Sequence, residues 1–460
     1  MTLLATPRVR DKTSDLAPKE AFYALADRIL AECHAGENIS LYFEGENTDF
    51  VRFTRARVRQ PGHVKQGFVS LRLASGAKSA EAKSALSGML EEDTLQMRRL
   101  LQALRSQVSV LPDDPYLSFP AAGEEGSSNS EEDNELPSGA RIVEDILGAA
   151  EGDDLVGILA AGGVFAGFAS STGQRNWFAR YPVHIDFSLQ LEGDRAIKDA
   201  YAGRRWDAKE FAGKVSRMKK ELALLRRAPR KIAPGSYRAY LAPAALDEVF
   251  QVLAWGGAFG LGAWETKESC LVRLHDPQVS LSRHVDILEH NADGFGPGFN
   301  AQGFMKPGCI KLIEGGHLRQ SLVSSRSSLE YGVPCTGAEA DEEPCALEMS
   351  GGELADEDVL TALGTGLYVS NLWYLNHSDR QGGRMTGMTR FGTFWVEQGE
   401  IVAPIQVMRF DDTLFRMLGS ELEALSARRQ RFMDTRSYGA RSTKSSLLPG
   451  ALLRSFSFTL

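Results

Sequence analysis

The histidines of this chain are the first residues to test for hydrolytic chemistry. A catalytic zinc site needs two or three imidazole, thiolate or carboxylate ligands, an open position for water and a nearby general base. Helical zinc motifs pair a histidine with a following glutamate, yet none of the eight histidines precedes a glutamate. His284 and His290 lie six residues apart, which on a helix would point them to different faces. We therefore expect solvated or locally bonded histidines here and no metal site.

A polar, glycine-rich segment at residues 371–412 is the most distinctive candidate for ligand binding. Loops of this composition between rigid strands often meet a ligand through backbone and side-chain groups. The candidate residues, for peptide binding or for a structural motif, are Asn371, Asn376, Asp379, Arg384, Thr389 and Arg390. A purely structural role, in which Asp379 and Arg384 lock a turn, is equally open.

Other catalytic and nucleotide-binding signatures do not occur. The sequence contains no GxSxG elbow, no Walker phosphate loop and no GxGxxG dinucleotide fingerprint. The acidic residues at 341–343 are consecutive, so they cannot converge on one ion as the alternating ligands of a calcium loop do. We expect residues 335–353 to form an exposed loop.

The first half of the chain predicts a mixture of helices and strands. Apolar residues recur at helical spacing over 21–34, and again over 78–110, where we expect one long helix. Between them, β-branched and aromatic residues predict three short strands. Residues 155–169 predict a hairpin around Gly162-Gly163, and the acidic segment 121–140 predicts a solvated or disordered loop.

The second half is richer in strands. A charged helix, then Pro229 and Pro234, mark a boundary near 230. Beyond it, Gly315-Gly316 and Gln398-Gly399 predict hairpin turns. The pattern predicts an α+β fold with an antiparallel, barrel-like C-terminal half. The predicted domains are an N-terminal lobe (1–85), a helical and hairpin middle (86–230, with the 121–140 loop) and a β-rich C-terminal domain (231–460).

Composition excludes several classes of protein. The formal net charge of −8 argues against a dedicated nucleic-acid binder, whose phosphate contacts need clustered cations. The longest apolar run, residues 155–169, is too short for a membrane-spanning helix, so no membrane partner is expected. Residues 1–20 have no apolar core of signal-peptide length, and the five cysteines form no CxxC pair. We expect a cytoplasmic protein.

Four segments resemble the TldD/PmbA (TldD/TldE) family of metallopeptidase-related proteins. They are ENTDFVRFTRARVRQ, the IKLIEGGHLRQSLVSSRSSLEYG hairpin, the block NLWYLNHSDRQGGRMTGMTRFGTFWVEQGEIVAPI and the closing SSLLPGALL, and the likeness spans about 20–460. The resemblance implies a heterodimer acting on unfolded or precursor peptides. One member, TldD, carries a helical His-Glu-x-x-x-His zinc site completed by a C-terminal cysteine, and its TldE/PmbA partner lacks that site.

The zinc ligands are missing where the family places them. The helix after the strand YRAYLAP reads AALDEVFQVLAWGGAFGLG, no histidine lies between His184 and His275, and the last cysteine is Cys345. Without ligands no bound water can be brought to a pKa near neutrality. Asp247 and Glu248 are the carboxylates of that helix, and we expect Glu248 to be exposed, with no catalytic role.

The chain thus resembles a non-catalytic TldE/PmbA-type subunit, with no catalytic residue, metal ligand or cofactor of its own. The expected partners are a TldD-type subunit, which would hold the zinc, and an extended peptide substrate. Two alternatives stay open. One is an autonomous hydrolase in which His284, His290 or His377 pairs with Asp286, Asp293 or Asp379. The other is a peptide-binding adaptor without a protease.

Overall fold

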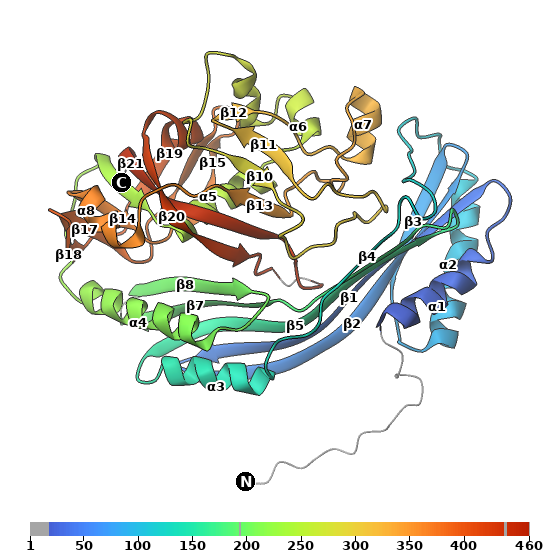
Figure 1. The fold of residues 1–460 in the computed structure, drawn as a ribbon, viewed down its shortest axis with the longest axis horizontal. Helices are drawn as coiled ribbons and strands as arrows, with labels where there is room; N and C mark the ends of the chain where they lie inside the picture. Colours follow the sequence, from blue (N-terminus) through green and yellow to red (C-terminus); the bar gives the residue numbers. More distant parts are fainter. Residues whose placement is uncertain (1–17, 193–194, 437–438, 460) are drawn as a thin grey trace, which may run out of the picture.

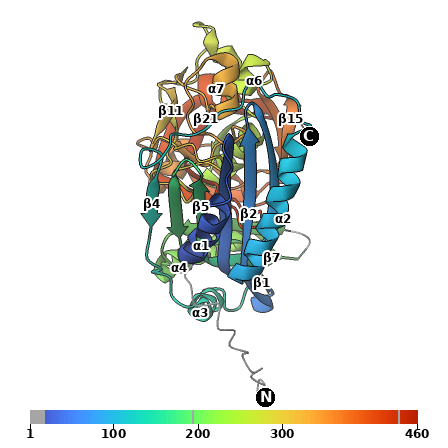
Figure 2. The same cartoon turned by 90° about the vertical axis from the view of Figure 1, so that its right-hand side faces the viewer.

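The computed structural model describes residues 18–192, 195–436 and 439–459. Its chain forms two large sheets with helices packed on them, which confirms the α+β prediction (Figure 1). The first sheet is long and curved, and the C-terminal half of the chain lies over one of its faces (Figures 1 and 2). None of the helices in the described part of the chain is long and apolar enough to cross a bilayer.

The first sheet has eight strands in the order β3-β2-β1-β5-β6-β4, with β7 and β8 continuing from β5. Its strands are β1 (Glu37–Thr54), β2 (Arg57–Ser75), β3 (Lys78–Ala85), β4 (Ser128–Glu131), β5 (Asp154–Ser170), β6 (Arg175–Arg180), β7 (Val183–Leu191) and β8 (Arg195–Gly203). Strands from both sides of residue 85 share this sheet. The three-domain division stays a prediction.

Four helices cover this sheet: α1 (Pro18–Leu30), α2 (Leu90–Val108), α3 (Gly139–Ala149) and α4 (Ala208–Leu225). Figure 1 shows α1 and α2 at one end of the sheet and α3 and α4 at the other. Each pair has its own core. Phe22, Leu101 and Trp177 belong to the core beside α1 and α2, while Ile146 and Phe211 belong to the core beside α3 and α4.

Three predictions for this half were wrong in part. The expected three short strands are two long ones, β1 and β2. Residues 78–85, expected at the start of a helix, form strand β3, and the helix begins only at Leu90. The acidic segment 121–140 includes the short strand β4, which pairs in parallel with β6 and is therefore ordered.

Strand β5 runs straight through Gly162-Gly163, so the predicted hairpin does not exist. Gly162 has φ of 143° and stands opposite Thr48 of β1. A Cβ atom at Gly162 would lie 2.3 Å from the carbonyl oxygen of Asn47. The glycine therefore permits close contact between two strands instead of a turn.

The second sheet has thirteen strands: β9 (Gly235–Leu241), β10 (Ile287–Glu289), β11 (Ile310–Glu314), β12 (His317–Leu318), β13 (Ala346–Met349), β14 (Gly366–Val369), β15 (Trp373–Asp379), β16 (Arg384–Met388), β17 (Thr393–Glu397), β18 (Glu400–Pro404), β19 (Arg409–Thr413), β20 (Leu422–Met433) and β21 (Ser445–Phe458). The long strand β21 organises it by pairing with β9, β13, β19 and β20. Most pairs are antiparallel, but β13–β21 and β9–β14 are parallel. Among the described residues the sheet stays open, so the barrel-like form is corrected to an open sheet.

Helical segments connect the strands of the second sheet. They are α5 (Pro243–Trp255), α6 (Leu261–Glu265), α7 (Ser325–Tyr331), α8 (Val359–Leu363), the 3-10 turns η1 (Cys270–His275) and η2 (Asp356–Asp358), and the π turn η3 (Arg416–Ser420). The two predicted hairpin turns in this half are confirmed. Positive φ values at Gly315-Gly316 and Gln398-Gly399 make the two-residue turns of β11–β12 and β17–β18.

Arg441, in the connection from β20 to β21, fastens the C-terminal half to the first sheet. Its buried guanidinium donates to the carbonyl oxygens of Ala160 (3.1 Å) and Pro182 (2.8 Å) and to Nδ1 of His184 (3.1 Å). Burial, and next the charge of Arg441, lower the pKa of His184 to about 3. The imidazole is therefore neutral and accepts this hydrogen bond.

Candidate functional site beside helix α5

Helix α5 occupies the place where the family resemblance locates its metal motif. Pro243 stands in its first turn, where the missing N–H costs nothing. Leu246, Val249, Phe250 and Leu253 recur at helical spacing and are buried in the core of the second sheet. A neighbouring stripe of the helix, which carries Asp247, Gln251 and Ala254, therefore faces a cavity.

The cavity beside α5 has a volume of about 260 Å³ and opens to the surface. Its walls come from α5, from the start of β13, and from the end of β20 and the start of β21. The lining residues are Asp247, Phe250, Gln251, Ala254, Trp255, Glu343, Pro344, Leu347, Phe432, Met433, Asp434, Arg436, Lys444, Ser445 and Ser446.

Asp247 is the polar centre of this cavity. The residue is 7% exposed, and its carboxyl group accepts hydrogen bonds from Ser446 Oγ and from Gln251 Nε2 (2.6 Å). Burial raises the pKa of Asp247 above its usual value, although these two hydrogen bonds oppose the rise. Both partners are uncharged, so the site favours the neutral acid more than a surface aspartate would.

Glu248, the next residue, is half-buried and not exposed as expected. Burial raises its pKa to about 7, and the nearby positive charge of Lys198 only partly offsets this effect. The helix thus carries two adjacent carboxyl groups that are both harder to ionise than in water.

The charged groups at the rim are already paired with one another. Lys444 Nζ lies 2.6 Å from a carboxylate oxygen of Glu343, and Arg436 Nε lies 2.8 Å from one of Asp434. The rim of the cavity therefore offers no unpaired charge to a ligand.

The donors around this cavity do not fit the zinc site that the resemblance implies for TldD. Protein zinc sites use imidazole, thiolate or carboxylate ligands, deprotonated and converging. The lining residues include three carboxylates but neither imidazole nor thiolate. Glu343 and Asp434 are engaged by cations, and burial raises the pKa of Asp247, which makes this carboxyl group a poorer metal ligand than a surface aspartate. The side chain that contacts Asp247 from the other wall, 199 positions away in sequence, is the hydroxyl of Ser446, which is not one of these ligand types.

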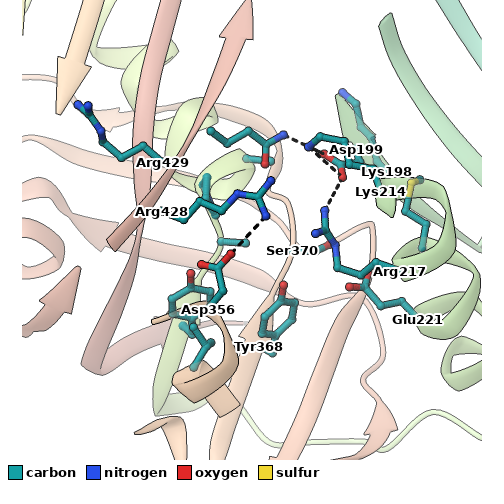
Figure 3. Close-up of a pocket in the computed structure, with 17 residues that line it drawn as sticks. Lys198, Asp199, Lys214, Arg217, Glu221, Asp356, Tyr368, Ser370, Arg428 and Arg429 are labelled. Atoms are coloured by element: carbon teal, nitrogen blue, oxygen red, sulfur yellow. Dashed lines mark hydrogen bonds and ion pairs between the residues drawn. The ribbon is translucent and has the colours of Figure 1, made fainter. Parts of the chain in front are cut away.

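A second cavity, of about 190 Å³, lies where α4 and β8 meet β9, β14 and β20 (Figure 3). At its centre the buried Asp199 accepts hydrogen bonds from Lys214 (3.3 Å), Arg217 (2.9 Å) and Gln430 (2.9 Å). Burial alone would raise the pKa of Asp199, but Lys214 and Arg217 hold it below its usual value. Because Gln430 belongs to β20, this network ties the two sheets together.

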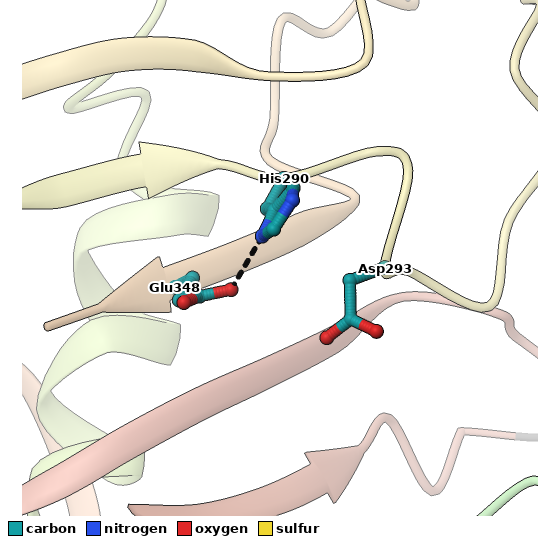
Figure 4. A group of neighbouring side chains, drawn as sticks. All are labelled: His290, Asp293 and Glu348. Atoms are coloured by element: carbon teal, nitrogen blue, oxygen red, sulfur yellow. Dashed lines mark hydrogen bonds and ion pairs between the residues drawn. The ribbon is translucent and has the colours of Figure 1, made fainter.

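His290, Asp293 and Glu348 form the one cluster of potential metal ligands found in the described part of the chain (Figure 4). His290 Nδ1 lies 2.7 Å from Glu348. However, Arg429 forms an ion pair with Glu348, and Arg431 forms one with Asp293. Both carboxylates are thus neutralised by guanidinium groups, which would repel a bound cation.

The other pairs proposed for an autonomous hydrolase are not joined in the described residues. Asp286 accepts a hydrogen bond from the backbone of Gly315, and His284 lies beside Arg283. His377 is half-buried with its ring against Trp255, at 5.4 Å between centroids. Asp379 instead accepts from the backbone N–H of Gly382.

The six candidates from the segment 371–412 do not converge on one site. Asn371 is buried, with its amide against the carbonyl groups of Ser370 and Lys198. Asn376 accepts a hydrogen bond from the N–H of His377 and lies on β15.

The remaining candidates divide between a turn and a cavity. Asp379 closes the turn between β15 and β16, and Arg384 pairs with Asp411 (2.7 Å) instead of with Asp379. Thr389 bonds to the backbone of Met408, and Arg390 stacks over Trp373 at 4.3 Å. Thr389 and Arg390 line a separate cavity of about 310 Å³. The assignment of these residues to peptide binding stays a prediction.

Comparison with known proteins agrees with this architecture. Residues 234–459 match the PmbA/TldA metallopeptidase C-terminal domain, which here includes α5 and the second sheet. No curated protein matches the chain.

Similar solved structures cover nearly the whole chain. TldE from Thermococcus kodakarensis has a TM-score of 0.77 at 13% identity, covering 96% of this chain and 100% of that one. A proposed modulator of a DNA gyrase from Thermotoga maritima has a TM-score of 0.74 at 13% identity, covering 95% and 100%. A similarly described protein from Bacteroides thetaiotaomicron has 0.69 at 15%, covering 96% and 98%. At these identities the likeness shows the shared fold. The domain match places residues 234–459 in the family of PmbA/TldA metallopeptidase C-terminal domains.

Proposed function

We propose that this chain is the non-catalytic, TldE/PmbA-like subunit of a TldD-type zinc metallopeptidase that acts on unfolded or precursor peptides. One observation carries the proposal: the cavity beside α5 is centred on Asp247, bonded to Ser446 and Gln251, where TldD would bind zinc. A hydrolytic site needs a metal-bound water or an activated nucleophile. This cavity supplies neither.

The proposed role is to complete a closed chamber with the zinc-bearing partner and to help hold the substrate. One cavity, of about 510 Å³, lies between the curved first sheet and the C-terminal half, and the α5 cavity of about 260 Å³ lies next to it, so an extended peptide has room there. We also place the protein in the cytoplasm, since all five cysteines are free thiols, as a reducing compartment favours.

The test is to purify the chain alone and together with a TldD-type subunit. We expect a stable mixed dimer by size-exclusion chromatography. Peptide hydrolysis and stoichiometric zinc should appear only when the partner is present. Zinc-dependent hydrolysis by this chain alone would overturn the proposal.

Three substitutions separate this role from that of an autonomous hydrolase. His284→Ala, His290→Ala and His377→Ala remove the histidines on which that alternative depends, and under our proposal all three leave hydrolysis by the mixed dimer unchanged. An adaptor without a protease would bind peptide but form no mixed dimer. Each of the three hypotheses therefore predicts a different combination of mixed-dimer formation and peptide hydrolysis.

A further inference from the structure

We propose that the cavity beside α5 seats one uncharged, apolar side chain of an extended peptide. This inference rests on the proposed function and adds the class of residue that the subunit selects. The place that a catalytic metal would take in TldD is, in this chain, a side-chain pocket.

One part of the cavity wall is apolar and well packed, and the polar residues of the lining complete the rest. Phe250, Leu347, Phe432 and Met433 are each buried, so they form a firm lining. Trp255, at the end of α5, is 47% exposed and offers an aromatic surface at the mouth. Aromatic and methionine side chains of this kind provide large contact area to an apolar ligand.

The charges around the cavity argue against an ionised ligand. The rim pairs Glu343–Lys444 and Asp434–Arg436 are complete, and the inner Asp247 is bonded to two neutral partners. A charged side chain would lose its water, while the rim pairs are complete and both carboxyl oxygens of Asp247 already accept hydrogen bonds, so its entry is costly. An apolar side chain has no such penalty and gains by leaving water.

A larger cavity lies next to this pocket, along the first sheet. It has a volume of about 510 Å³, and Arg436 lines both cavities, so they are neighbours. Its lining is mostly polar and includes Arg52, Gln60 and Asp186 from strands β1, β2 and β7. One apolar residue of a peptide can therefore anchor in the α5 pocket while the polar main chain on one side of it runs over the sheet.

The experiment measures binding of short fluorescein-labelled peptides to the full chain by fluorescence anisotropy. The peptides consist of serine and glycine with one central residue, which is Phe, Leu, Asp or Lys. We expect the Phe and Leu peptides to bind at least about tenfold more tightly than the Asp and Lys peptides. Equal binding of all four, or no saturable binding of the Phe peptide, would overturn the inference.

Two matched substitutions on the same helix locate the binding. Ala254→Leu fills the α5 pocket and should weaken binding of the Phe peptide at least about tenfold. Ala244→Leu makes the same exchange but points into the Asp199 cavity, and should leave binding unchanged. Circular dichroism and thermal unfolding check that both variants fold. Unchanged binding by a folded Ala254→Leu variant would refute the assignment.

The outcome of the peptide-binding experiment is independent of the test for the mixed dimer. If no mixed dimer forms but the Phe peptide binds in the α5 pocket, the proposed function fails and the pocket stands. If the dimer forms and Ala254→Leu weakens the dimer instead of peptide binding, the pocket holds a segment of the partner. The inference is then wrong while the proposed function stands.

Discussion

Asp247 is the polar centre of the α5 cavity, where burial raises its pKa and both of its hydrogen-bond partners are uncharged. Asp247→Asn keeps the shape and both polar contacts of the side chain, so we expect it to change the free energy of unfolding by less than about 1 kcal/mol at neutral pH. Asp247→Leu leaves Ser446 without its partner and should cost more, about 1–3 kcal/mol. Urea unfolding measures both. A larger loss in the Asn variant would show that an amide cannot replace the carboxyl group in these two contacts.

Glu248 makes the stability of the fold depend on pH. Its pKa in the folded chain is raised to about 7 from 4.5, so folding favours the protonated form. This contribution is complete below the unfolded pKa, and it is lost as pH rises from about 4.5 through about 7. Glu248→Gln should remove about 3 kcal/mol of that pH dependence. The exposed Glu92→Gln is the control and should follow the wild-type pH profile in urea unfolding.

Strand β5 depends on glycine where it passes β1. Gly162→Ala places a Cβ atom 2.3 Å from the Asn47 carbonyl oxygen at a φ of 143°, so the two strands must separate. We expect a loss of about 3 kcal/mol or more in thermal unfolding. Gly148→Ala in α3 is the control: a Cβ there meets nothing within 4 Å, and the change should be neutral or stabilising by up to about 1 kcal/mol.

Among the contacts between elements, we expect the Asp199 network to contribute most to the free energy of unfolding. Asp199→Asn leaves the buried Lys214 without a counter-charge and should cost about 3–5 kcal/mol in urea unfolding. Asp186→Asn on the neighbouring strand removes a more exposed pair with Lys198 and should cost less than about 1 kcal/mol. Similar costs for the two variants would contradict a special role for the network.

At the scale of the whole molecule, the two sheets should unfold together. Phe394 of β17 is buried in the core that also contains Ile197 of β8 and Val215 of α4, so this core belongs to both halves. We expect hydrogen exchange in β1 and β21 to report the same opening free energy. Phe394→Ala should lower both by about 3–5 kcal/mol. Different values in the unaltered chain would show that the halves open separately.

The local glycine signal predicted a hairpin turn correctly only where the two flanking segments pair with each other. Gly315-Gly316 and Gln398-Gly399 are hairpin turns, but Gly162-Gly163, with the same local signal, lies inside one long strand. The difference is the partner strand: β1 pairs with β5 on both sides of Gly162, and periodicity cannot reveal that contact.

The sequence placed a helix after the strand YRAYLAP, but it predicted neither the cavity beside α5 nor the residues that Asp247 contacts there. Ser446 reaches Asp247 across 199 positions, and no local motif encodes such a pair. The segment 371–412 looked like one site because its polar residues are close in sequence. In the fold, Arg384 forms an ion pair with Asp411 and Thr389 forms a hydrogen bond with Met408, so these residues do not share one site.

The Arg441 contact has a consequence for how the protein is made. Synthesis proceeds from the N-terminus, so all strands of the first sheet have left the ribosome long before residue 441. Until then the carbonyl oxygens of Ala160 and Pro182 lack the guanidinium that later binds them. A nascent chain that ends before Arg441 therefore lacks these hydrogen bonds between the C-terminal half and the first sheet. Translation must be almost complete before the native contacts can all form.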